Sequence, residues 1–160
     1  MLFLSRIITV CLLAGLVAEQ ANAEVSIDRR EMERFGDGFF VMISGEITND
    51  DYQLLLATRG EVSEKIMRVA VLTSRGGDIN AAMAIGRYLR AEEFDVIVPS
   101  NAVCYSACVF LLASGIYKTV DGQVGIHRPY FISKGSGLIS KAIKATKAEI
   151  EAYLEEMNIP

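Results

Sequence analysis

Apolar and polar residues along this chain follow two different periods, and the points where the period changes mark the expected elements. A short β-rich run occupies residues 39–44, and longer apolar runs occupy residues 66–73 and 94–99, as is typical of buried strands in a parallel sheet. Small polar residues that cap helices precede two further segments, residues 48–58 and 79–92, and the second has apolar positions at helical spacing. The pattern therefore predicts strands that alternate with helices, as in parallel βαβ units.

The second half of the chain continues the alternation with shorter elements. We expect an apolar helix at residues 106–113 and short strands at residues 117–120 and 123–127. Residues 138–157 have the pattern of a long amphipathic helix with lysines and glutamates on its outer face. The predicted fold class is therefore α/β, in a single domain.

The first 23 residues have the pattern of a secretory signal peptide. Arg6 supplies a positive charge, residues 7–18 form an apolar run too short to span a bilayer comfortably, and an Ala-x-Ala cleavage site follows at residues 21–23. We expect cleavage, one domain over residues 24–160, and a periplasmic or secreted protein without a membrane segment after processing. An uncleaved N-terminal membrane anchor is the alternative.

The charge and cysteine content of the chain make some classes of binding partner unlikely. The chain has 16 Lys and Arg against 20 Asp and Glu, a formal net charge of −4, and it lacks the basic stripe of a nucleic-acid-binding protein. Cleavage removes Cys11 and leaves Cys104 and Cys108, which flank Ser106. Two cysteines in an oxidising compartment often form a disulfide, but an i,i+4 bridge inside a regular helix would be strained. The alternative is that both serve as small buried apolar residues. Two thiols and one distant histidine fall short of a structural zinc site, so we expect no metal.

The candidate chemistry lies in Ser106 and in His127, the only histidine of the chain. A serine hydroxyl is a poor nucleophile unless a base takes its proton, and histidine is the usual base, so the pair indicates acyl transfer. Ligands of α/β folds bind beyond the carboxyl ends of strands, where Ser106 and the Gly76-Gly77 turn are both expected. The amides of Ala107 and Gly77 are candidate donors to an oxyanion. Taken singly, the serine is as easily a helix cap, the histidine a structural residue and the glycines a tight turn.

The order of these motifs resembles that of a known family, which has a Ser-x-Gly-Gly turn, then a nucleophilic serine, then an Ile-His-x-Pro sequence. Over about residues 40–129 the chain is similar to the proteolytic subunit of Clp protease, within the crotonase-like fold. The residues that match in order are Ser74, Gly76, Gly77, Ser106, Ile126, His127 and Pro129. The resemblance implies stacked ββα units with residues 138–157 as a handle-like helix, and a homo-oligomer without a cofactor. It also implies Ser106 as nucleophile, His127 as base, and the amides of Gly77 and Ala107 as the oxyanion hole.

Two departures from the family bear on mechanism. Peptidases of the family orient the histidine with an aspartate that follows the handle helix, whereas this chain stops at Pro160 and has no aspartate after Asp121. The third member is therefore absent, lies beyond the sequence given, or is replaced by Asp121 or by a glutamate such as Glu149. The best-known members are fed by a cytosolic ATPase, which an exported relative cannot use. We therefore expect peptides or unfolded proteins as substrates.

The sequence thus favours an exported serine endopeptidase that hydrolyses peptide bonds through Ser106 and His127. The main alternative is a catalytically inactive crotonase-like scaffold that binds peptides or protein partners in the same crevice. A third hypothesis is a Ser-Lys peptidase whose base is Lys141, Lys144 or Lys147. An acyl-CoA enzyme is disfavoured because CoA is not an extracytoplasmic cofactor, and a thiol oxidoreductase because Cys-x-x-x-Cys is not the usual redox spacing.

Overall fold

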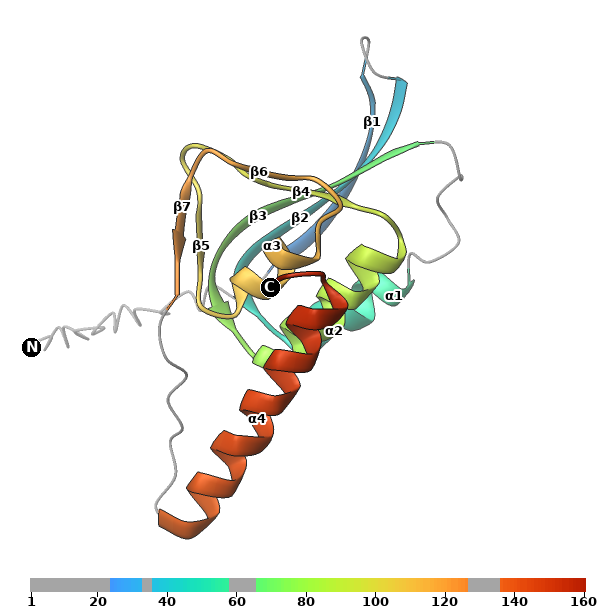
Figure 1. Ribbon diagram of the computed structural model, residues 1–160. Coiled ribbons are helices and arrows are strands. Elements are labelled where there is room, and N and C mark those ends of the chain that lie inside the picture. The colour runs from blue at the N-terminus through green and yellow to red at the C-terminus, as the bar shows by residue number, and fades with distance from the viewer. Residues whose placement is uncertain (1–23, 33–35, 58–65, 127–135) are drawn as a thin grey trace, which may run out of the picture.

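The computed structural model describes residues 24–32, 36–57, 66–126 and 136–160, and within these ranges the protein has an α/β fold (Figure 1). The strands are β1 (Glu24–Met32), β2 (Gly36–Ile47), β3 (Met67–Gly77), β4 (Asp95–Val98), β5 (Val103–Tyr105), β6 (Lys118–Val120) and β7 (Gln123–Gly125). The helices are α1 (Asn49–Ala57), α2 (Ile79–Ala91), α3 (Cys108–Ser114) and α4 (Ser136–Glu156). Helices alternate with single strands or strand pairs, in the order β1-β2, α1, β3, α2, β4-β5, α3, β6-β7, α4.

The predicted signal peptide lies outside the described residues. Among the helices of the described ranges, none is both long enough and apolar enough to cross a membrane.

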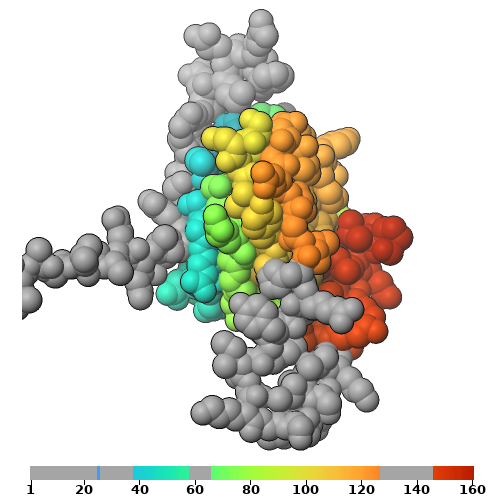
Figure 2. Space-filling view, turned by 90° about the vertical axis from the view of Figure 1, so that its left-hand side faces the viewer, coloured from blue at the N-terminus to red at the C-terminus, as the bar shows by residue number. Residues whose placement is uncertain are grey.

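Strand β3 belongs to two sets of parallel strands. In the first set, β2, β3, β4 and β6 lie side by side, and β1 adds an antiparallel strand next to β2. In the second set, the end of β3 pairs with β5 through Ser74 and Cys104, and β5 pairs with β7. The strands therefore turn a corner along β3, and the sheet nearly closes into a barrel (Figure 1). Figure 2 shows the second set from outside as adjacent bands of β3 (green), β5 (yellow) and β7 (orange), with β2 (cyan) of the first set on the other side of β3.

The hydrophobic core lies between one face of the strands and the helices. Strand β2 buries Phe39, Val41 and Ile43 almost completely, and these alternate residues share one face. Met42, on the opposite face, is 39% exposed, and β3 and β4 likewise alternate buried with half-buried positions over most of their length. The continuous apolar runs at residues 66–73 and 94–99 are typical of strands buried on both faces, but β3 and β4 are fully buried mainly on one face, because the helices pack on one side of the sheet (Figure 1).

Four local features differ from the sequence-based expectations. Strand β1 was not predicted because its charged run at residues 28–31 hides any apolar period, as is common in an edge strand. Strand β5 was not predicted because three residues are too few to show a period. Strand β3 continues through the expected turn to Gly77, because its last residues pair with β2 and β5. Helix α3 begins at Cys108, which leaves Ser106 in the preceding turn.

The C-terminal part of α4 packs against α2 and α3 mainly through one tyrosine. Tyr153 is fully buried, donates its hydroxyl hydrogen to the carbonyl oxygen of Phe110 at 2.7 Å, and meets the Phe110 ring edge-on. Gly86 of α2 makes room for it, since a Cβ there would lie 1.9 Å from the Tyr153 hydroxyl. Arg87 lies over the Tyr153 ring and bonds Glu156 at 2.6 and 3.0 Å. We call these five residues the α4 seat.

The electrostatics of the α4 seat favour its hydrogen bonds. Burial raises the pKa of Tyr153 far above its ordinary value, so the phenol remains protonated and able to donate. Hydrogen bonding from Arg87 lowers the pKa of the exposed Glu156 carboxyl, which keeps it ionised. Arg90 adds a link at the end of the helix, because its guanidinium donates to the carbonyls of Gly115 and Met157. The last helix is therefore attached to the body by both packing and charge.

Candidate active site

Ser106 occupies the turn between β5 and α3, with a backbone conformation that is uncommon for a residue with a side chain. Its φ is 54°, in the left-handed region. Its N–H donates to the carbonyl of Gly125 in β7 at 2.9 Å, and its carbonyl accepts from the N–H of Val109 at 3.1 Å. A sharp strand-to-helix turn of this kind exposes a nucleophile in α/β hydrolases, and left-handed residues cluster at active sites generally. We call residues 105–107 the elbow.

Gly76 lies directly against the elbow. A Cβ at this position would be 2.8 Å from the Cβ of Ser106, 2.9 Å from the carbonyl oxygen of Tyr105 and 3.0 Å from the amide nitrogen of Ala107. Its φ of 107° also favours glycine. Because even a methyl group here would displace backbone or the serine, the position requires glycine for two independent reasons.

Ser74 fixes the turn that carries Gly76. Its buried hydroxyl donates to the carbonyl of Gly45 at 2.5 Å and accepts from the amide of Gly76 at 3.0 Å. Ser74 also pairs with Cys104 across the junction of the two strand sets. The Ser-x-Gly-Gly motif therefore works as a unit in which a buried hydroxyl holds the glycine backbone at the elbow.

The amide of Ala107 is the best-placed donor to an oxyanion. Ala107 is 1% exposed, and within the described part of the chain its N–H donates no hydrogen bond. Buried backbone N–H groups are nearly always paired, so an unpaired one beside a serine suits an oxygen of a reacting ligand. Gly77, the other predicted donor, is exposed and lies beside Ile47 at the end of β3. Of the two glycines, Gly76 is the one that the structure places against Ser106 and Ala107.

The predicted base, His127, lies outside the described residues. The chain that leads to it is described as far as Ile126. Gly125 pairs with Tyr105, and the Gly125 carbonyl accepts the hydrogen bond from the Ser106 amide. His127 comes two residues later in the sequence. Strand β7 therefore directs the chain to the elbow immediately before the only histidine.

The two carboxylates considered as substitutes for an orienting acid are placed elsewhere. Asp121 is exposed in the turn before β7, where its amide donates to the carbonyl of Val98 at 2.9 Å. Four residues of extended chain, or about 13 Å, separate it from Gly125 at the elbow end of that strand. Glu149 is exposed on α4, and its side chain forms no hydrogen bond or ion pair with the described residues. The described structure does not bring Asp121 to Ser106, and it gives Glu149 no contact with Ser106.

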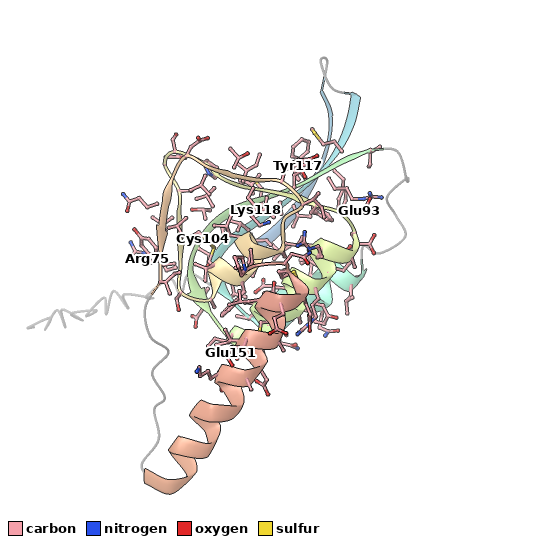
Figure 3. The ribbon with its side chains drawn as sticks, viewed as in Figure 1. Arg75, Glu93, Cys104, Tyr117, Lys118 and Glu151 are labelled. Carbon is pink, nitrogen blue, oxygen red and sulfur yellow. A yellow bond between two sulfur atoms is a disulfide. The ribbon has the colours of Figure 1, made fainter. Side chains whose placement is uncertain are left out.

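The lysines of the Ser-Lys hypothesis lie on α4. Lys147 pairs with Glu151 at 3.3 Å on the exposed surface of the helix, where Figure 3 labels Glu151. The side chains of Lys141 and Lys144 lie outside the described part of the chain. Lys147 is therefore engaged in an ion pair with Glu151 on the surface, and no described contact links it to the elbow.

A disulfide joins Cys104, within β5, to Cys108, the first residue of α3 (Figure 3). The S–S distance is 2.06 Å, the Cα atoms are 5.2 Å apart, and both residues are fully buried. Of the two alternatives left open by the sequence, the structure has the bridge. It is feasible because α3 begins only at Cys108, so the cysteines span a turn rather than two points of one helix. The described residues contain no group of three potential metal ligands.

No protein-family model matches the chain, and no curated protein matches it significantly. Function is therefore inferred from the elbow itself. The class of site that the geometry defines is a serine in a left-handed strand-to-helix turn, packed against a glycine and next to a buried backbone amide that donates no hydrogen bond to any described residue.

Proposed function

We propose that the protein is an exported serine peptidase that forms an acyl-enzyme on Ser106, in a crotonase-like fold of the Clp-protease type. The observation that carries the proposal is the left-handed Ser106, in contact with Gly76 and next to the Ala107 amide, which has no hydrogen-bond partner among the described residues. Two features of the fold support it: β3 is shared by two parallel strand sets, and a long C-terminal helix follows them. Both agree with what the family resemblance implies.

In the proposed reaction, the Oγ of Ser106 attacks the carbonyl carbon of a peptide bond while its proton passes to His127. The oxyanion that forms accepts a hydrogen bond from the Ala107 amide. The C–N bond then breaks, and His127 returns the proton to the leaving amine. Water activated by the same histidine finally hydrolyses the ester on Ser106.

The turnover of the proposed enzyme depends on a carboxylate that orients its histidine, and the described structure does not bring Asp121 or Glu149 to Ser106. In a serine protease, loss of the orienting aspartate's charge lowers turnover by about 10⁴-fold. Covalent labelling by an activated phosphonate demands less of the base, so it is the more sensitive measurement. We expect peptides or unfolded proteins as substrates, because no ATP-driven unfoldase operates outside the inner membrane.

Export is part of the same proposal. The first 23 residues have the signal-peptide pattern, and a buried disulfide is typical of proteins that mature in an oxidising compartment. We also propose that the protein assembles into a homo-oligomer through α4, as the handle helix of the resembled family does. Light scattering that gives a monomer at micromolar concentration would contradict the assembly without affecting the chemistry.

The direct test is covalent labelling of the processed, exported protein with a fluorophosphonate probe. We expect the probe on Ser106, as located by peptide mass spectrometry, and no labelling of Ser106→Ala. The matched control is Ser100→Ala, which removes an exposed serine near the other end of β5 and should label like the wild type. His127→Ala should lower the labelling rate by orders of magnitude, since the serine loses its base.

Each result separates the hypotheses. Labelling that survives His127→Ala but is lost on removal of a lysine of α4 would favour the Ser-Lys peptidase. A folded wild-type protein that takes no probe would contradict the peptidase proposal and favour the peptide-binding scaffold, whose equilibrium binding to unfolded peptides could then be measured.

A further inference from the structure

The chain closes a covalent ring around the candidate nucleophile. Cys104 and Cys108 are joined by a disulfide across a sequence separation of 4, and Ser106 lies midway between them. Cys104 is anchored in the sheet, since it pairs with Ser74 on one side and with Val124 on the other. Cys108 begins α3. The ring therefore connects the strand that enters the elbow to the helix that leaves it.

The short distance between the Cα atoms of Cys104 and Cys108 favours a chain reversal at the elbow. The two Cα atoms are 5.2 Å apart, whereas four steps of extended chain would separate them by about 13 Å. The chain must therefore reverse within the three residues between the cysteines. Ser106 contributes to the reversal with a φ of 54°, which residues with a Cβ seldom adopt without external constraint.

Two neighbouring contacts depend on the same reversal. The Ser106 amide reaches the Gly125 carbonyl at 2.9 Å, and the Cβ of Ser106 lies against Gly76. Gly76 belongs to β3, which also pairs with β2, so this side of the contact is fixed by the sheet, whereas Gly125 belongs to β7, which pairs with β5 itself. If the elbow relaxed towards an ordinary φ, Ser106 would move relative to both partners, and the Ala107 amide would turn with it.

We propose that Cys104 and Cys108 are positioning residues whose disulfide holds Ser106 in its left-handed conformation. The catalytic consequence rests on the proposed function, whereas the conformational consequence does not. The bridge forms when the thiols of Cys104 and Cys108 transfer two electrons and two protons to a disulfide oxidant, which is reduced to a dithiol. The elbow is therefore ordered after oxidation, which links a competent serine to the oxidising compartment.

The test compares the wild type with Cys104→Val/Cys108→Ala, which keeps both buried positions apolar. The matched control is Leu55→Ala, which removes a fully buried side chain of α1 and lowers stability without touching the elbow. Hydrogen exchange of the Ser106 amide, followed by NMR well below the unfolding temperature, reports the elbow directly. We expect exchange on the order of tenfold faster in the cysteine variant, as the cost of a left-handed residue predicts, and little change relative to core amides in Leu55→Ala.

Fluorophosphonate kinetics supply the second readout. The saturating labelling rate should fall by a similar factor in the cysteine variant, while the probe concentration at half-saturation stays the same, because the binding surface is retained. Reversible reduction of the wild type by a dithiol should reproduce both changes, and reoxidation should restore them.

Three outcomes would overturn the proposal. The first is an unchanged Ser106 exchange rate in the cysteine variant. The second is an equal increase in the hydrogen-exchange rates of amides throughout β2 and β3, or failure of both the variant and the reduced wild type to fold. In either case the bridge would stabilise the whole fold rather than the elbow. The third is a labelling rate that does not change although exchange does. If the wild type takes no probe, the peptidase proposal fails, but the exchange experiment still decides whether the bridge holds the elbow.

Discussion

The elbow at residues 105–107 and the α4 seat both contact α3, but they are stabilised in opposite ways. At the elbow, contacts are made by backbone and small residues, with a left-handed Ser106 held by a disulfide. At the seat, a large side chain, Tyr153, fills a slot formed by Gly86 and Phe110 and satisfies its hydroxyl there. The elbow holds an unfavourable backbone conformation in place, whereas the α4 seat stabilises the fold by burying the Tyr153 side chain.

This difference indicates which region is under functional constraint. Strained backbone persists where the surrounding structure over-determines it, and it is concentrated at sites that act on ligands. A fully buried tyrosine in an ordinary helix needs no such explanation, because its burial stabilises the fold directly. We therefore expect changes at the elbow to affect reactivity more than stability, and changes at the seat to do the reverse.

Apart from the substitutions of Ser106 and His127 themselves, the largest effect on reactivity is expected for Gly76→Ala. The new methyl group would lie 2.8 Å from the Cβ of Ser106, at a φ that alanine avoids, so the serine must move. A displacement of this size costs about a hundredfold or more in reaction rate. Labelling kinetics measure the loss, and Gly38→Ala is the control, since its Cβ meets only the end of the Phe40 ring. Labelling of Gly76→Ala at the wild-type rate would contradict the proposed role of this contact.

The largest effect on stability is expected for Tyr153→Ala. The substitution empties a fully buried site and removes the hydrogen bond to Phe110, so the free energy of unfolding should fall by about 3–5 kcal/mol. Urea denaturation gives the value, and Leu154→Ala on the same helix, whose side chain is only half-buried, is the milder control. At a temperature where Tyr153→Ala remains folded, its labelling rate should stay close to that of the wild type. A rate loss as large as that of Gly76→Ala would remove the distinction between the two regions.

The smallest effect is the pH dependence of the ion pair between Arg87 and Glu156. The pKa of Glu156 is lowered in the folded protein, so its contribution to stability is present above the ordinary carboxyl pKa. That contribution disappears as the pH falls through the lowered value. Both side chains are nearly half exposed, so less than about 1 kcal/mol is at stake. Unfolding free energies of Glu156→Gln should be lower than wild type at pH 7 and should converge with it at strongly acidic pH. A constant difference at all pH values would contradict the assignment.

The sequence predicted the long elements well because their periods are clear. The segment at residues 79–92 is predicted as a helix, and the structure has α2 there, because several apolar residues recur at helical spacing and Asp78 caps it, accepting from the Ala81 amide at 2.7 Å. The long last helix is likewise present as α4. Three-residue strands such as β5 carry no periodic signal, so their existence depends on partners distant in the sequence.

The candidate site was predictable in composition but not in geometry. The order of the motifs pointed to Ser106 and to the glycine turn, whereas the contact of Gly76 with the elbow depends on β3 bending into a second strand set. The choice between a disulfide and two buried thiols depended on where α3 begins, which shifts by two residues from the expectation. The roles of Ser106 and His127 remain proposals, and His127 itself lies outside the described residues.

The most direct test of the central claim is the distance between the Oγ of Ser106 and the nearer ring nitrogen of His127 in a crystal structure of the processed, oxidised protein. The proposed mechanism predicts a separation within hydrogen-bond reach, about 2.6–3.2 Å, or one that closes to this range when a phosphonate occupies the serine. An imidazole directed to the opposite side of the sheet, with the phosphonate bound, would contradict the proposal that this histidine activates this serine.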